Sequence, residues 1–121
     1  MSVDSQTGAM KELKDDRYDL IPGLALEYVA QVYGRSSQDH GGKYPARNWE
    51  KGYAWSKSFR ALIKHAYKAW RGEWLDPESG LPHLAHAAWH CLCLMTYFDY
   101  GLGTDDRSAL KLQTLVAKGK P

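Results

Sequence analysis

The segment from Pro82 to Tyr100 constrains the fold more than any other part of the sequence. Apolar residues cover nearly the whole circumference of the helix that it predicts: Leu84, Ala85, Ala87, Ala88, Trp89, Leu92, Leu94, Met95 and Phe98. A helix that is apolar all round is buried on several sides. The segment is too short and too rich in histidine for a membrane span. It therefore predicts the central helix of a bundle, or a helix in a subunit interface.

Three further helices are expected around this one. The first runs from Pro22 to a stop at Gly34, and the second from an N-cap at Ser56 to a stop at Gly72. The last covers residues 105–118, with Thr104 as its cap and Ala109, Leu112, Leu115 and Val116 docked on the bundle. No segment shows a convincing strand alternation, so the fold class is all-α with four helices.

The remaining segments read as connections. Residues 1–16 are polar and predict a mobile lead-in, which leaves residues 17–121 as a single domain. Residues 35–53 contain several glycines and a proline without any sustained period. Loops of this length in compact domains are often functional.

Charge and cysteine content narrow the function classes. The net charge of +2 is too small to imply a stable nucleic-acid partner. Cys91 and Cys93 would point apart on a helix, so a disulfide between them is not expected. No apolar run of about 18 residues and no leader-like segment is present, so no membrane partner is expected and the cytoplasm is the expected location.

A histidine stripe is the first candidate for chemistry. His83, His86 and His90 fall within roughly 60° of one another on a helix that turns by about 100° per residue. Imidazoles packed together without partners are costly, and a metal ion, a carboxylate or an anionic substrate would relieve that cost. Separately hydrogen-bonded structural histidines are an equally good interpretation of the spacing alone.

A carboxylate-rich turn directly precedes this stripe. Glu73 and Asp76, followed by Glu78, offer the oxygen ligands that Mg²⁺ or Mn²⁺ prefers. The same acids are also typical of the start of a helix, where they complement its dipole. Together with the histidines, these acids favour a functional site over a purely structural role.

Basic and aromatic residues suggest a nucleotide. Lys43, Arg47, Asn48 and Trp49 share the long loop and offer charge for phosphate, an amide for a base edge and an aromatic ring for stacking. Lys64 belongs to a basic stripe that also fits a solvated helix face. His65 follows it at the edge of the apolar face and can reach the same pocket.

These residues together resemble the phage dATP/dGTP diphosphohydrolases, a MazZ-like family related to the MazG-type all-α NTP pyrophosphatases. The resemblance covers about Lys11 to Tyr100 and rests on Asp19–Pro22, Tyr33–Gly34, Lys43–Tyr44, Asn48–Trp49, Lys51–Gly52, Ser56, His65, Gly72–Glu73, Asp76–Gly80 and His83–Trp89. It implies a MazG-like helical arrangement completed by oligomerisation, as a dimer or tetramer. It also implies cleavage of dGTP or dATP to the monophosphate and pyrophosphate with Mg²⁺ or Mn²⁺, which would shape the phage nucleotide pool in the host cytoplasm.

The resemblance leads to a hypothesis for each candidate residue. The metal ligands would be Glu73, Asp76, His83 and His86. The catalytic residues would be His65, Glu73 and Asp76. The substrate would be bound by Lys43, Arg47, Asn48, Trp49 and Lys64. The chain lacks the glutamate-rich E-E-x-x-E helix of MazG-type enzymes, and His86 and His90 stand roughly where a later acidic pair would be. A non-catalytic helical protein with a structural His/carboxylate metal site is the alternative, and a small nucleic-acid-binding factor is a weaker one.

Overall fold

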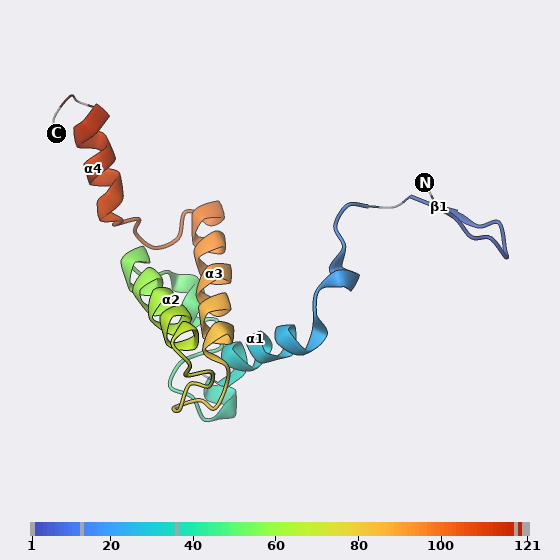
Figure 1. Ribbon diagram of the computed structural model, residues 1–121, viewed down its shortest axis with the longest axis horizontal. Coiled ribbons are helices and arrows are strands. Elements are labelled where there is room, and N and C mark those ends of the chain that lie inside the picture. The colour runs from blue at the N-terminus through green and yellow to red at the C-terminus, as the bar shows by residue number, and fades with distance from the viewer. Residues whose placement is uncertain (1, 13, 36, 118, 120–121) are drawn as a thin grey trace.

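The computed structural model describes residues 2–12, 14–35, 37–117 and 119. Its centre is an antiparallel pair of helices, α2 (Trp55–Trp70) and α3 (His83–Tyr100), which lie side by side (Figure 1). Helix α1 (Gly23–Arg35) packs across the end of the pair where α3 begins. The predicted all-α class is confirmed, with α4 (Ser108–Ala117) as the fourth helix.

Short elements connect these helices. The predicted loop over residues 35–53 contains two 3-10 turns, η2 (Gln38–His40) and η3 (Asn48–Lys51), and a third, η1 (Tyr18–Leu20), precedes α1. The lead-in is not free of strands, since β1 (Ser2–Val3) pairs with β2 (Met10–Lys11) in an antiparallel hairpin. The mobility of residues 1–16 stays a prediction.

The core lies between α2 and α3. Its buried cluster consists of Trp55, Cys93, Leu94 and Tyr97, and aromatic residues of α1 and η3 pack against it. The Tyr97 hydroxyl donates to the carbonyl oxygen of Trp49 at 2.6 Å. The indole N–H of Trp55 donates to the carbonyl oxygen of Leu102 at 2.9 Å. These two bonds tie the connecting segments to the helix pair.

Two expected helix starts are wrong for one shared reason. Helix α2 follows Ala54 and α4 begins only at Ser108, because the chain around Thr104 pairs with the start of α2 instead of capping a helix. The amide of Trp55 donates to the carbonyl of Thr104 at 2.9 Å. Ser56 is not an N-cap either, since its hydroxyl donates to Asp106 Oδ2 at 2.7 Å. Tertiary pairing therefore fixes both starts.

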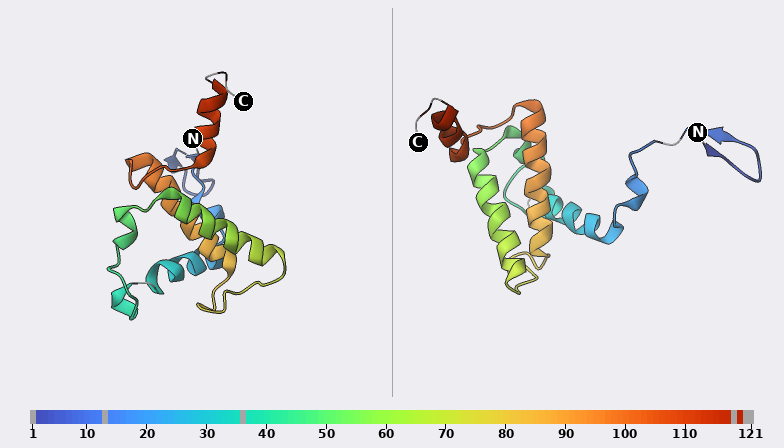
Figure 2. Two further views of the ribbon diagram at one scale, coloured as in Figure 1. Left: turned by 90° about the vertical axis from the view of Figure 1, so that its left-hand side faces the viewer. Right: turned by 45° about the horizontal axis from the view of Figure 1, so that its top comes forward.

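The expected docking of α4 is also wrong. Among the described residues α4 packs against no other element, and it projects away from the helix pair (Figure 2). Leu112 is 62% exposed and Val116 70% exposed. Part of α3 is uncovered as well, with Met95 and Phe98 exposed. Within the described part of the chain, none of the helices is both long and apolar enough to cross a bilayer.

Candidate functional site

Four imidazoles meet where α2 ends and α3 begins. His65 of α2 stacks on His86 with ring centroids 4.7 Å apart and planes 15° apart. The centroid of His83 lies 5.1 Å from that of His65, and the centroid of His90 lies 6.4 Å away. The α3 stripe therefore faces α2, and the ring from α2 stands at its centre.

A carboxylate and two imidazoles form a chain of short hydrogen bonds at this place. Glu73 Oε2 lies 2.7 Å from His83 Nε2, and His83 Nδ1 lies 2.8 Å from His65 Nδ1. A carboxylate only accepts, so His83 carries its hydrogen on Nε2 and its Nδ1 accepts from His65 Nδ1–H. The second nitrogen of His65, Nε2, then carries a lone pair, and the described residues give it no hydrogen-bond partner.

The turn between α2 and α3 folds back to create this contact. The His83 amide donates to the Trp74 carbonyl at 2.9 Å, and the Asp76 amide donates to the Leu81 carbonyl at 2.8 Å. The two arms of the turn are therefore paired, which holds Glu73 beside the first residue of α3. His83 is 1% exposed, so its orientation is fixed by packing as well as by its two partners.

A second branch runs from Asp76 to His86. The Ser79 hydroxyl donates to Asp76 Oδ2 at 2.9 Å and lies 2.7 Å from His86 Nε2. Asp76 Oδ2 is itself 3.3 Å from His86 Nε2. Since the hydroxyl hydrogen points to Asp76, Ser79 accepts from His86 Nε2–H. Ser79 was not a candidate, although a serine three residues after an aspartate in a Pro/Gly turn is typical of such a hydroxyl bond.

Burial favours the neutral form of three imidazoles of the site. Burial lowers the pKa of His65 to about 4, with help from His86, from the positive charge of Lys64 and from His83. Burial likewise lowers the pKa of His90 to about 4. The pKa of His86 is lowered by burial and by Arg35, against the opposing effect of Asp76. At neutral pH these rings are therefore proton acceptors.

The carboxylate of the second branch is stabilised as an anion. Burial raises the pKa of Asp76, but the hydrogen bond from Ser79 and the adjacent ring of His86 outweigh burial, so that its pKa lies below the ordinary value. This branch thus places an anionic carboxylate beside an imidazole whose pKa is lowered. This is the arrangement in which a carboxylate orients an imidazole for proton transfer.

The four expected metal ligands do not surround one point. Glu73 with His83 forms one branch and Asp76 with His86 the other, and both nitrogens of His83 are already hydrogen-bonded. Across the residues that the structure describes, no three His, Cys, Asp or Glu side chains are placed to hold one metal ion. As positioned, the donors do not fit a protein-bound cation, and the ligand roles stay a prediction that this geometry does not support.

The expected substrate residues lie in two places. Lys64 is close enough to influence the pKa of His65, His86 and His90. Lys43 and Arg47 are exposed on the loop, and Arg47 pairs with Glu50. Their contact with a substrate stays a prediction.

Asn48 and Trp49 line a separate cavity of about 150 Å³, together with Tyr33, Tyr44, Pro45, Ala46, Tyr53 and Trp89. Trp89 connects this cavity to the histidines, because its ring meets that of His90 edge-on at 4.7 Å. Trp89 was not among the predicted site residues, since an aromatic residue at helical spacing is usually a core residue.

Comparison with known proteins identifies the class. The chain matches the family of dATP/dGTP diphosphohydrolases, N-terminal domain, over residues 5–107. The chain belongs to this family, as its sequence motifs predicted, and the family's name makes it a hydrolase of nucleotides. The match ends just before α4. Curated proteins and solved structures give no significant match.

Proposed function

We propose that this chain hydrolyses dGTP and dATP between the α- and β-phosphates and releases the monophosphate and pyrophosphate. The observation that supports the proposal most directly is the hydrogen-bonded chain Glu73–His83–His65 in a member of this family. Mg²⁺ or Mn²⁺ enters as the ion bound to the triphosphate, and therefore as part of the substrate. In an infected cell the reaction would shape the pool of purine deoxynucleotides available to a phage.

His65 is the proposed general base. A water molecule attacks the α-phosphorus, its proton moves to Nε2 of His65, and the bond from the α-phosphorus to the bridging oxygen breaks as pyrophosphate leaves. His83 and Glu73 act through His65 as positioning residues, because they fix its tautomer and offset the positive charge of its imidazolium. No step of this scheme requires a metal ligand from the protein.

Positive charge beside the rings supports an anionic substrate. Lys64 and Arg35 both act electrostatically on the histidines, and their charge would stabilise the developing negative charge on the phosphates. Lys43 and Arg47, which lie exposed on the loop, are proposed to contact the triphosphate. Asp76 is proposed to act through Ser79 and His86, on the opposite side of His65.

A homo-oligomer, dimer or tetramer, is part of the proposal. Exposed apolar side chains on α3 and α4, such as Phe98 and Val116, support it, because such surfaces are usually covered in assemblies. Sedimentation of the purified chain measures it, and a monomer at micromolar concentration would contradict it.

The central experiment incubates the purified chain with dGTP or dATP and Mg²⁺ or Mn²⁺ in water enriched in the heavy oxygen isotope. We expect the monophosphate and pyrophosphate in equal amounts, with the heavy oxygen in the monophosphate because water attacks the α-phosphorus. Formation of the diphosphate, absence of the monophosphate, or heavy oxygen in the pyrophosphate would overturn the scheme. Parallel reactions with dCTP and dTTP measure the preference for purines.

A further inference from the structure

Trp89, at the aromatic cavity beside the histidines, carries a polar atom that the fold leaves unsatisfied. Trp89 lines this cavity, and its indole nitrogen is buried without a hydrogen-bond partner among the described residues. An indole N–H only donates, so whatever satisfies it must present an acceptor atom. Buried polar groups without partners are uncommon and costly, and a binding site is one place where they persist.

The walls of the cavity suit a flat ring. Tyr33 meets Trp49 edge-on with centroids 5.7 Å apart, and the Tyr33 and Trp89 rings are 5.6 Å apart at 43°. Aromatic side chains that line a cavity offer faces on which a planar heterocycle can stack. A volume of about 150 Å³ is of the order of a nucleobase and too small for a whole nucleotide.

A second polar group gives the cavity an acceptor. Asn48 Nδ2 lies 3.4 Å from the Tyr53 hydroxyl, so the amide is oriented by its nitrogen and its carbonyl oxygen is left to accept from a ligand. Trp89 and Asn48 together therefore match a ring with both an acceptor and a donor on its edges. Every nucleobase has this combination, and both purines add N7 as a further acceptor.

The position of the cavity agrees with the chemistry next to it. Trp89 and His90 are consecutive residues of α3, and the His90 ring is 6.4 Å from that of His65. A nucleotide whose base occupies the cavity would have its sugar and phosphates on the side of the histidines and Lys64. The two regions are thus adjacent parts of one site.

We infer that this cavity is the base subsite and that Trp89 is a specificity-determining residue, whose indole N–H donates to an acceptor atom of the purine. The inference rests on the proposed function for the identity of the ligand, but it concerns binding and not bond cleavage. Trp89 holds the base in place and takes no part in proton transfer.

The test observes the indole N–H itself in the unaltered protein. Heteronuclear NMR of the isotope-labelled chain resolves the indole signals of its five tryptophans, and Trp89→Phe identifies the signal of Trp89 by its loss. We expect dGMP and deoxyguanosine to shift this signal downfield, whereas deoxyribose phosphate and thymidine leave it in place. A Trp89 signal that does not respond to any purine ligand would overturn the inference, even if the chain hydrolyses dGTP.

Substitution gives a second, independent readout. Trp89→Phe keeps an aromatic wall and removes the N–H, so we expect the KM for dGTP to rise at least about tenfold with kcat changed less than about threefold. Trp70→Phe is the matched control, because Trp70 is 86% exposed at the end of α2 and does not line the cavity; we expect no change in KM. An equal KM for wild type and Trp89→Phe would contradict the inference. If the Trp89 signal responds to dGMP but no hydrolysis occurs, the subsite stands and the proposed function fails.

Discussion

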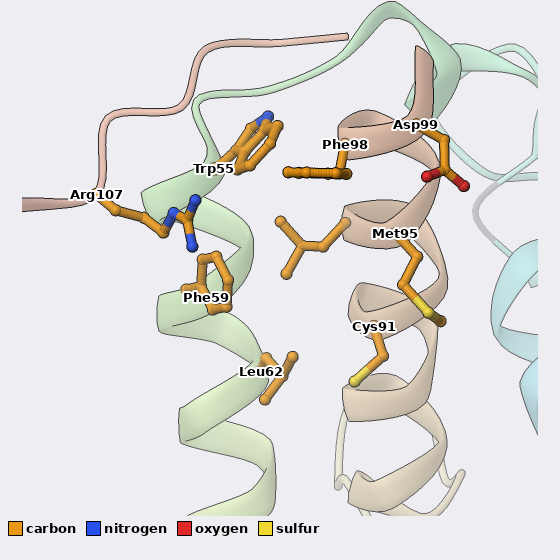
Figure 3. A pocket seen from close by; sticks show the side chains of 9 residues that line it. Trp55, Phe59, Leu62, Cys91, Met95, Phe98, Asp99 and Arg107 are labelled. Carbon is orange, nitrogen blue, oxygen red and sulfur yellow. The ribbon is translucent and has the colours of Figure 1, made fainter. Parts of the chain in front are cut away.

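The same two helices, α2 and α3, form both ends of the helix pair, but different interactions hold the two ends together. At the end where α3 begins, the contacts are hydrogen bonds among His65, His83 and Glu73. At the opposite end, Trp55 and Phe98 lie 6.2 Å apart in an apolar groove of about 540 Å³, and Arg107 lies against Trp55 at the edge of this groove (Figure 3). The histidine end therefore supplies chemistry and depends on partnered polar groups, whereas the other end contributes stability through the buried ring of Trp55 and leaves Phe98 exposed.

The largest expected effect is on catalysis at the histidine end. In His65→Asn the amide nitrogen still donates to His83 Nδ1, but no lone pair replaces that of Nε2. We expect kcat for dGTP to fall by at least about a hundredfold with little change in stability, since a general base typically contributes a hundredfold or more. Steady-state kinetics and urea denaturation measure the two effects.

The control for this variant lies at the other end of the same helix. Phe59→Leu alters the apolar groove and no group of the histidine cluster, so kcat should stay within about threefold of wild type. A comparable loss of kcat in both variants would show that the two ends do not have separate roles.

The apolar end is expected to respond in stability and not in rate. Gly103 has φ +71° and a Cβ there would lie 2.1 Å from the Tyr53 carbonyl oxygen, so Gly103→Ala should cost about 3 kcal/mol or more. Gly101 has φ +67° with open space around it, so Gly101→Ala should cost only about 1 kcal/mol. Urea denaturation of the matched pair measures the difference, and equal losses would contradict the close approach of the two chain segments.

A smaller effect is expected at Glu73. In Glu73→Gln the side chain keeps an oxygen that accepts from His83 Nε2 but loses the charge that offsets the imidazolium of His65. We expect kcat to fall roughly tenfold to a hundredfold with KM unchanged. His65→Asn combined with Glu73→Gln should be no slower than His65→Asn alone. Additive losses would mean that Glu73 acts independently of His65.

The smallest expected effect is a pH dependence of stability that originates at the histidine end. The folded-state pKa of His65 and of His90 is about 4, below the ordinary value, so the unfolded chain takes up protons first as the pH falls. The stability that these rings contribute is fully present above about pH 6.5 and is lost toward pH 4. Between pH 7.5 and pH 5 we expect the Tm to fall by about 5 °C.

A variant assigns this pH dependence to its source. In His90→Leu one buried titrating ring is removed, so the fall in Tm between the same two pH values should be smaller than in wild type. An unchanged slope would place the titrating groups elsewhere.

Local sequence signals predicted the helices but not their contacts. The apolar period and the glycines around the first three helices placed α1, α2 and α3 within a few residues of their observed bounds. Ser56 and Thr104 were wrongly predicted as caps, so the true starts of α2 and α4 were missed. A serine or threonine before a helix is typical of a cap unless a tertiary partner binds it instead. The exposed position of α4 likewise depends on packing, which its own pattern does not encode.

The site could be predicted only in part for the same reason. Helical spacing was enough to place His83, His86 and His90 on one face. The contact between His65 and His83 depends on how α2 and α3 pack, and the role of Ser79 depends on the fold of the turn. Trp89 differs from an ordinary core residue in its unsatisfied nitrogen and its place beside a cavity, and both depend on the packing of the folded chain.

The proposed chemistry depends on a neutral His65 ring with its hydrogen on Nδ1 and a lone pair on Nε2. Heteronuclear NMR of the chain with isotope-labelled histidine reports the protonation of each ring nitrogen at pH 7, and His65→Asn assigns the signals. We predict a protonated Nδ1 and an unprotonated Nε2 for His65, together with a protonated Nε2 for His83. A His65 that is doubly protonated, or that carries its hydrogen on Nε2, would contradict its role as the general base.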